Sequence, residues 1–305
     1  MIEPYVTRPE PNPARLTRVP MALAATLLLS LALVVSATAQ TYSSIDCPGY
    51  TYAHAYGIND VGAIAGDCED QSGHVSGFLL RRGAFTMIDV PGAAATSAWD
   101  VNNLGAVVGD YFTEDGFIRG FLFQQGRFTT IDFPGAIHTS AQGLDDLGRI
   151  VGIFIDDSEV FKAFLLVGGH FQVIEPPESA STSAVGINAL KQIVGTWDDA
   201  DGITRGYLLK KGHFTPIAYP GAVSTTSNRI NVLGQIVGSW GLNDGHFHGY
   251  LLTCHGFESI DYPGATKTTG RDINNLGDIV GSFDAGDGAV HGYLRTHDAQ
   301  DHDED

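Results

Sequence analysis

The chain has 305 residues, of which 43% are hydrophobic, and it carries three cysteines and a formal net charge of -18 at pH 7. This acidity argues against nucleic acid as a partner, because surfaces that bind it are basic, and it equally disfavours an anionic membrane surface. Three cysteines are too few for a disulfide scaffold, whereas the length allows a large core within one domain.

The first 39 residues have the three parts of a secretory signal peptide. Arg15 and Arg18 precede an apolar run over residues 21 to 35, and Ala37-Thr38-Ala39 provides a small-residue cleavage site. A run of about fifteen residues is shorter than the roughly twenty needed to cross a bilayer, which disfavours a membrane anchor. We therefore predict a mature chain that starts at Gln40, is not inserted in a membrane, and is secreted to the periplasm or the cell exterior. Loss of three arginines and two glutamates with the leader changes the net charge from -18 to -19.

One 43-residue frame then repeats six times, starting at residues 45, 88, 131, 174, 217 and 260 without insertion or deletion. The copy at residues 88 to 130 shows four short apolar segments, at residues 96 to 101, 106 to 112, 119 to 123 and 127 to 132. Turn residues separate these segments, and none of them has the period or length of a helix. Repeats with this period and layout indicate a propeller or an array.

The repeated segments predict an all-β, six-bladed β-propeller with four-stranded antiparallel blades over residues 40 to 296. Segments that are apolar on both faces must be covered on both, and stacking blades around an axis achieves this. Aromatic residues at frame position 34 and leucine at position 35 provide the core between blades. A glycine recurs in every second strand, as at Gly66 and Gly109, and we expect it to make room for an aromatic ring of the next strand or blade.

The two ends of the repeat array complement each other. Residues 42 to 46 read as a fourth strand without its first three, and the sixth copy ends at residues 291 to 296 without a fourth strand. We predict that the N-terminal strand pairs into the last blade and closes the ring, with His291 and Asp46 as a charge pair across the seam. Residues 297 to 305 are predicted to be an acidic disordered tail, and the protein is predicted to be a monomer.

Strand directions define two rims. The crossover rim holds the proline-glycine connections between copies, such as Pro91-Gly92, together with the acidic second turns. The asparagine-turn rim holds the first turns, such as residues 102 to 105, together with the third turns. Cys47 and Cys68 fall on the crossover rim and Cys254 on the other, so a Cys47–Cys68 disulfide with a reduced Cys254 is the preferred pairing.

The motif INxxGxIVG, followed by HG(F/Y)L, resembles the HAF family of extracellular bacterial repeats. It occurs as INDVGAIAG at Ile58, INVLGQIVG at Ile230 and INNLGDIVG at Ile273, with HGY at His248 and His291. The glycine-rich stretch of the family appears here as IDxPGA. The resemblance implies export and a propeller-like repeat fold, and it brings no established activity and no catalytic residues.

Differences between the copies are the guide to a binding site. Side chains that break the repeat gather around the predicted first strands and the crossovers before them, and we expect them to form a ligand pocket near the axis under the crossover rim. A solvated channel is the alternative. The candidate binding residues are Tyr52, His54, Trp99, Asp100, His138, Arg229, Lys267 and Arg271.

Two acidic turns invite a calcium interpretation, with Asp198 and Asp201 in one and Asp284 and Asp287 in the other. Neither follows the twelve-residue loop pattern, and Asp-Gly is a common hairpin turn, so we favour turns and predict no required cofactor. The histidines show no zinc-ligand spacing apart from His246 and His248, which we interpret as strand surface residues.

No nucleophile motif is present, so no catalytic residue is predicted. The function that the sequence favours is an exported, non-enzymatic propeller that binds a glycan or a protein through the crossover rim. One alternative is a carbohydrate-active hydrolase or lyase with Asp100 and Asp272 as acid and base. A structural protein of the cell envelope is another.

Overall fold

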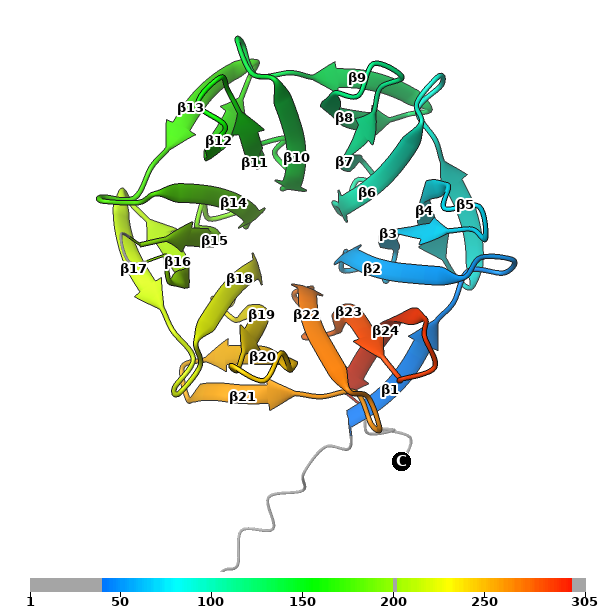
Figure 1. Ribbon diagram of the computed structural model, residues 1–305, viewed down its shortest axis with the longest axis vertical. Coiled ribbons are helices and arrows are strands. Elements are labelled where there is room, and N and C mark those ends of the chain that lie inside the picture. Colours follow the sequence, from blue (N-terminus) through cyan, green and yellow to red (C-terminus); the bar gives the residue numbers. More distant parts are fainter. Residues whose placement is uncertain (1–39, 200–201, 298–305) are drawn as a thin grey trace, which may run out of the picture. The chain divides into compact units, whose positions relative to one another are not determined.

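The computed structural model describes residues 40–199 and 202–297, which form six four-stranded sheets around a common axis (Figure 1). All pairings within the sheets are antiparallel. The predicted all-β, six-bladed propeller is therefore confirmed. This part of the chain contains no helix long and apolar enough to cross a membrane.

In the first five blades the strands follow one another outward from the axis in chain order, and in blade six β1 is the outermost strand. Blade one contains β2 (Tyr52–Ile58), β3 (Ile64–Glu69), β4 (Val75–Arg81) and β5 (Ala84–Ile88). Blade two contains β6 (Ala95–Val101), β7 (Val107–Phe112), β8 (Ile118–Gln124) and β9 (Arg127–Ile131). Blade three contains β10 (His138–Leu144), β11 (Ile150–Ile155), β12 (Phe161–Val167) and β13 (His170–Ile174).

The second half of the ring repeats this plan. Blade four contains β14 (Ser181–Ile187), β15 (Ile193–Asp198), β16 (Thr204–Lys210) and β17 (His213–Ile217). Blade five contains β18 (Ser224–Ile230), β19 (Ile236–Gly241), β20 (Phe247–Thr253) and β21 (Gly256–Ile260). Blade six contains β22 (Lys267–Ile273), β23 (Ile279–Asp284), β24 (Val290–His297) and, from the start of the chain, β1 (Gln40–Ile45).

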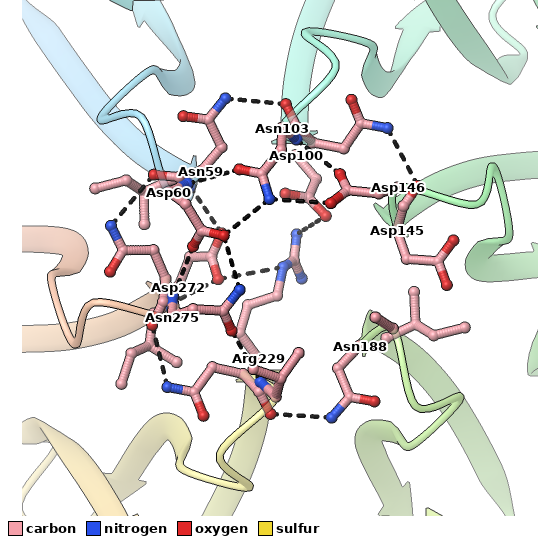
Figure 2. Close-up of a pocket in the computed structure, with 18 of the residues that line it drawn as sticks. Asn59, Asp60, Asp100, Asn103, Asp145, Asp146, Asn188, Arg229, Asp272 and Asn275 are labelled. Carbon is pink, nitrogen blue, oxygen red and sulfur yellow. Dashed lines mark hydrogen bonds and ion pairs between the residues drawn. The ribbon is translucent and has the colours of Figure 1, made fainter.

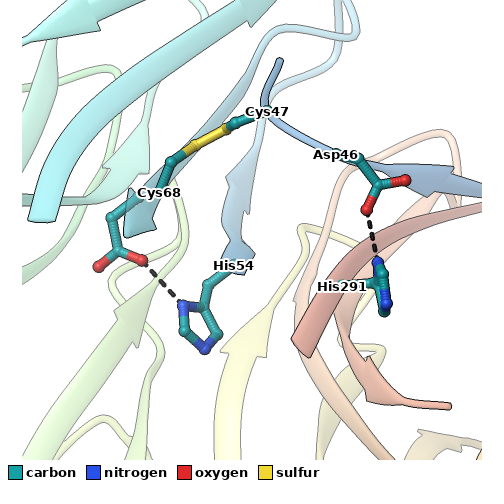
Figure 3. Close-up of a disulfide and its surroundings, with 6 residues drawn as sticks. Asp46, Cys47, His54, Cys68 and His291 are labelled. Carbon is teal, nitrogen blue, oxygen red and sulfur yellow. Dashed lines mark hydrogen bonds and ion pairs between the residues drawn. A yellow bond between two sulfur atoms is a disulfide. The ribbon is translucent and has the colours of Figure 1, made fainter. Parts of the chain in front are cut away.

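Strand β1 closes the ring as predicted. It pairs antiparallel with β24 from Gln40 opposite His297 to Ile45 opposite Gly292, as the outermost strand of blade six. Just beyond the last pair, Asp46 Oδ1 and His291 Nδ1 lie 2.6 Å apart (Figure 3). The seam is thus held by a ladder of backbone hydrogen bonds and by the predicted charge pair.

The crossover beside this seam carries a disulfide. Cys47 lies two residues after the end of the seam strand and Cys68 lies near the end of β3 in blade one. The two are bonded with their Cα atoms 6.3 Å apart (Figure 3). That separation is within the usual range for disulfides. Cys254 is a free, exposed thiol. The bond ties the closing strand of blade six to the neighbouring blade.

The recurrent glycine of each second strand provides room for an aromatic ring, as predicted. A Cβ built at Gly109 would lie 2.7 Å from the ring of Phe121 in the next strand and 2.0 Å from the carbonyl oxygen of Ser97. Phe121 is completely buried and packs edge-on against Phe128. The aromatic column of the frame therefore fills the interior of each blade.

Every innermost strand contains a β-bulge at the same place in the frame. In β6, for example, Ala98 pairs with Gly109 and Asp100 pairs with Val108, which leaves Trp99 without a partner. The same irregularity occurs in β2, β10, β14, β18 and β22. A bulge inserts one extra residue and re-aims the backbone locally. These six bulges shape the axis of the propeller.

Candidate functional site

The bulges bring six different side chains together around the axis. The residue left unpaired in each innermost strand lines one pocket, and we call this the bulge pocket. Each of these strands runs from the crossover rim to the asparagine-turn rim. The unpaired residue comes before its successor in the strand, so the bulge pocket lies nearer the crossover rim than the residues that follow the bulges. Its lining is Tyr56, Trp99, Gln142, Val185, Asn228 and Arg271, with Arg229 beneath.

Arg229 forms the floor of the bulge pocket and crosses the axis. Its Nη2 donates to the carbonyl oxygens of Trp99 at 3.1 Å and Gln142 at 2.7 Å. Its Nη1 donates to the carbonyl oxygens of Val185 and Asn228. The bulge carbonyls of four blades thus accept hydrogen bonds from one buried guanidinium. A buried charge requires such hydrogen-bond partners. The arrangement separates the bulge pocket from a second axial pocket on the asparagine-turn side.

Asp100 and Asp272 lie on the asparagine-turn side of this floor, at the frame position of Arg229 itself. Asp100 accepts hydrogen bonds from the N–H groups of Val101 at 2.8 Å and Leu144 at 2.9 Å. Asp272 likewise accepts from the N–H groups of its own successor and of Ile58, both at 2.7 Å. Each carboxylate therefore joins the innermost strands of two adjacent blades (Figure 2).

Burial dominates the electrostatics of the two carboxyls. It raises the pKa of Asp100, while Arg229 Nη2 at 3.6 Å from Asp100 Oδ2 opposes the shift. The pKa of Asp272 is raised to about 7, chiefly by burial and in smaller part by Asp100, against the opposing effect of Arg229. The Nε of Arg229 lies 3.8 Å from Asp272 Oδ1 and has no hydrogen-bond partner. One guanidinium thus serves two buried acids, and it forms no hydrogen bond with either of them.

The asparagine-turn pocket has a volume of about 90 Å³. Its wall is a chain of links between neighbouring blades, in which the side chain of one turn donates to a carbonyl of the next. Asn59 Nδ2 donates to the carbonyl oxygen of Asn102 at 2.9 Å, and Asn102 Nδ2 donates to that of Asp145 at 3.1 Å. The recurrent asparagine of the repeat therefore connects the blades around the mouth of the axis (Figure 2).

The bulge pocket is partly aromatic and partly basic. The rings of Tyr56 and Trp99 lie 4.2 Å apart, and the guanidinium of Arg271 lies 5.4 Å from the centre of the Tyr56 ring. Trp99 Nε1 donates to Asp110 Oδ2 at 2.8 Å, which fixes the indole. Burial raises the pKa of Asp110 to about 6, although the hydrogen bonds from Ser140 and Trp99 lower it. Aromatic rings and hydrogen-bond donors therefore line the same small bulge pocket.

Three of the eight predicted binding residues line the bulge pocket together, namely Trp99, Arg229 and Arg271. Asp100 is on the axis but lines the asparagine-turn pocket instead, because the bulge turns the residue after Trp99 toward the opposite rim. Tyr56 and Gln142 were not predicted. The signal that could have identified them is their frame position, which holds a different residue type in every copy.

The other four predicted binding residues do not line either axial pocket. Tyr52 donates to the carbonyl oxygen of Gly288 at 3.2 Å, and His54 Nδ1 lies 2.9 Å from Asp67 Oδ1 (Figure 3). His138 accepts from the N–H of Ile118 at 3.1 Å. Lys267 is exposed at the start of β22. Of these four, His54 reaches the edge of the bulge pocket, because its ring stacks on that of Tyr56 with the centroids 5.5 Å apart.

The carboxylates of the acidic turns are engaged within the turns. Asp284 Oδ1 accepts from the N–H of Gly286 at 2.7 Å, and Asp287 accepts from the N–H of Ala289 at 3.0 Å. Asp198 accepts from the hydroxyls of neighbouring strands, and Asp201 lies outside the described residues. These bonds fit the turn interpretation. A thermal-shift comparison of calcium with a chelator tests the metal alternative, since binding requires a rise in Tm with calcium.

The fold is similar to several solved propellers. A mutant of the Aleuria aurantia lectin bound to Fucalpha1-6GlcNAc aligns with a TM-score of 0.52 at 11% identity, over 81% of this chain and 93% of the lectin. SapL1 lectin in complex with alpha methyl fucoside aligns at 0.52 and 12%, over 80% and 92%. TolB from Acinetobacter baumannii aligns at 0.55 and 10%, over 77% and 64%. Neither a protein-family model nor a curated protein matches the sequence. At these identities the likeness shows the fold alone.

Proposed function

We propose that this chain is an exported, non-enzymatic propeller that binds a glycan in the bulge pocket, on the side of the crossover rim. The observation that carries the proposal is that six copies of one frame place six different residue types around the axis at a single position. Packing requirements explain the columns that repeat, and they do not require this diversity. A site that contacts one asymmetric ligand does require it.

The chemistry of the bulge pocket suits a sugar. The half-buried indole of Trp99, which packs on the buried ring of Tyr56, offers apolar contact to the C–H side of a pyranose ring. Gln142, Asn228 and Arg271 offer hydrogen-bonding groups to its hydroxyls. The pocket has a volume of about 40 Å³. This is room for about three water-sized groups, so we expect it to receive the edge of one terminal sugar. The lectins of similar fold, which were crystallised with fucosides, support a glycan ligand by analogy.

The hydrolase alternative requires the carboxylates of Asp100 and Asp272, and both are indeed on the axis. Each of their four oxygens, however, already accepts a backbone N–H, and together they hold four innermost strands. They also lie on the opposite side of Arg229 from the bulge pocket. Because both carboxylates hold strands together, the structure of the axis favours a binding function over a catalytic one.

A glycan array probed with residues 40–305 tests the proposal first. The best glycan is then titrated against a variant with Trp197 and Trp240 changed to Phe, in which Trp99 is the single tryptophan. We expect the ligand to change the fluorescence of this variant. We also expect Gln142→Ala to weaken binding about tenfold, the effect of one lost hydrogen bond in a buried polar site, and the exposed control Gln172→Ala to leave binding unchanged.

Two results would overturn the proposal. One is the absence of any glycan ligand on the array, which is the result expected if the protein has a purely structural role in the cell envelope. The other is a glycan whose affinity is the same for Gln142→Ala, Gln172→Ala and the parent protein, because that ligand would bind elsewhere on the propeller.

A further inference from the structure

The asparagine-turn pocket contains a ring of six inward N–H groups, one from the last residue of each innermost strand. In blade four, Asn188 N–H donates to the Gln192 carbonyl at 3.1 Å, so the adjacent pair Ile187–Ile193 is not hydrogen-bonded and Ile187 N–H points away from β15, toward the axis. The same holds for Ile230 in blade five. A backbone N–H in such a position needs an acceptor.

Two aspartates supply acceptors for four of these six groups. Asp272 serves blades six and one, and Asp100 serves blades two and three. The remaining pair belongs to blades four and five, at Ile187 and Ile230. By the alternation around the ring, a third aspartate would stand at position 186, where the chain has Gly186. Within residues 40–199 and 202–297, no side chain accepts from either of these two N–H groups.

The rim above this pair is also incomplete. Asn103 links Asp60 and Asp146 across the mouth, with its Nδ2 donating to Asp60 at 2.8 Å and to Asp146 at 3.0 Å. At the same frame position, blades four and five carry Ala189 and Val232. The ring of polar side chains therefore opens directly above the two unserved N–H groups, and the opening has apolar sides.

Two arginines lie beside the opening, each paired with an aspartate, in a pocket whose lining includes Asp60, Asp100, Asp145, Asp146 and Asp272. Arg149 Nη2 donates to the carbonyl oxygen of Ala189 at 2.8 Å. Arg229 lines the same pocket, and its buried Nε lies 3.8 Å from Asp272 Oδ1 without a hydrogen bond. Lys191 occupies the turn of blade four with a φ of 58°, where the other five copies have glycine. A lysine in the left-handed region costs backbone energy, so this substitution works against the fold at one of the two turns beside the gap.

We infer that this gap is a binding site for an aliphatic carboxylate that enters along the axis from the asparagine-turn rim. Its two oxygens accept from the N–H groups of Ile187 and Ile230, as the oxygens of Asp100 accept from Val101 and Leu144. Its hydrocarbon part passes between Ala189 and Val232. The exposed side chains of Leu190 and Leu233, at 65% and 71% exposure, lie in the same two turns and extend the apolar path. This site is on the opposite rim from the proposed glycan pocket and does not depend on it.

Ligand-observed NMR titrations of residues 40–305 test the inference with hexanoate, acetate and hexanol as probes. We expect hexanoate to bind about tenfold more tightly than acetate, because its added methylene groups lose contact with water. We also expect it to bind about tenfold more tightly than hexanol, which cannot accept hydrogen bonds from both N–H groups as a carboxylate does. A short peptide that ends in leucine, with a free or an amidated C-terminus, is the further arm. Preference for the free peptide over hexanoate would identify a polypeptide C-terminus as the source of the carboxylate.

Three variants locate the site. Val232→Asp restores at the gap the residue type that copies one and three carry there, and it should weaken hexanoate binding about tenfold by repulsion. Val61→Asp adds the same charge on the same rim, at a side chain that is 78% exposed in blade one, and should leave binding unchanged. Lys191→Gly should weaken binding severalfold while it raises the stability of the fold, which a purely structural role of the lysine does not predict.

Equal affinity for hexanol and hexanoate would overturn the inference, as would equal effects of Val61→Asp and Val232→Asp. The absence of hexanoate binding at about 10 mM, an affinity weaker than about 3 kcal/mol, would also overturn it and assign the two N–H groups to water.

Discussion

Loss of the Cys47–Cys68 disulfide should destabilise the propeller by about 3 kcal/mol. The bond closes a segment with a sequence separation of 21 residues. Chain-entropy arithmetic for a loop of that length gives about 3 kcal/mol at 25 °C. Because this bond ties the seam strand to blade one, its loss also removes one constraint on ring closure.

Urea denaturation measures this effect directly. We would use a Cys254→Ser background, so that the exposed thiol cannot exchange with the disulfide, and compare it with and without reductant. A matched variant with Cys47 and Cys68 also changed to Ala should unfold at the lower midpoint under both conditions. A reductant effect below about 0.5 kcal/mol, or an equal effect in the matched variant, would refute this account of the seam.

Three further predictions concern the core, the seam and pH. Phe121→Ala should cost about 3–5 kcal/mol in urea unfolding, because the ring is completely buried; a cost under about 1 kcal/mol would contradict its place in the core. Deletion of residues 41 to 47 should lower Tm far more than deletion of residues 297 to 305, and equal effects would contradict ring closure by β1. The pKa of Asp110, raised to about 6 from an ordinary 3.8, means that the folded state binds this proton more tightly than the unfolded chain. Its contribution to stability is therefore present below pH 3.8 and lost as the pH rises to about 6, by up to about 3 kcal/mol. The stability of Asp110→Asn relative to the parent protein should accordingly rise between pH 3.8 and about 6. Parallel profiles of unfolding free energy against pH for the two proteins would refute the assignment.

Repetition made the fold predictable from the residues alone. Each copy had to bury the same aromatic and leucine positions, and a sheet that is apolar on both faces has few ways to do so. The start of the repeat array has a fourth strand without its first three, and the last copy lacks a fourth strand. Ring closure therefore followed from counting the strands of each copy. The Cys47–Cys68 pair followed from strand direction, because direction decides which rim a residue occupies.

The axial site was only partly predictable. Trp99, Arg229 and Arg271 were recognised because they break the repeat, and they do meet at the axis. Asp100 lies on the asparagine-turn side of Arg229, and Tyr56 and Gln142 were not among the predicted residues. The cause is the bulge in each innermost strand, since one inserted residue changes which way every following side chain faces.

What the sequence determined by itself is the frame: six blades, their core columns, their turns and their closure, all of which follow from a pattern repeated every 43 residues. What only the tertiary structure decided is the pattern on the axis, where residues 43 or more positions apart become neighbours. Arg229 binds carbonyls of four blades there, and two aspartates serve four of six N–H groups. No local rule of propensity or spacing encodes such a ring, because its partners come from every copy at once.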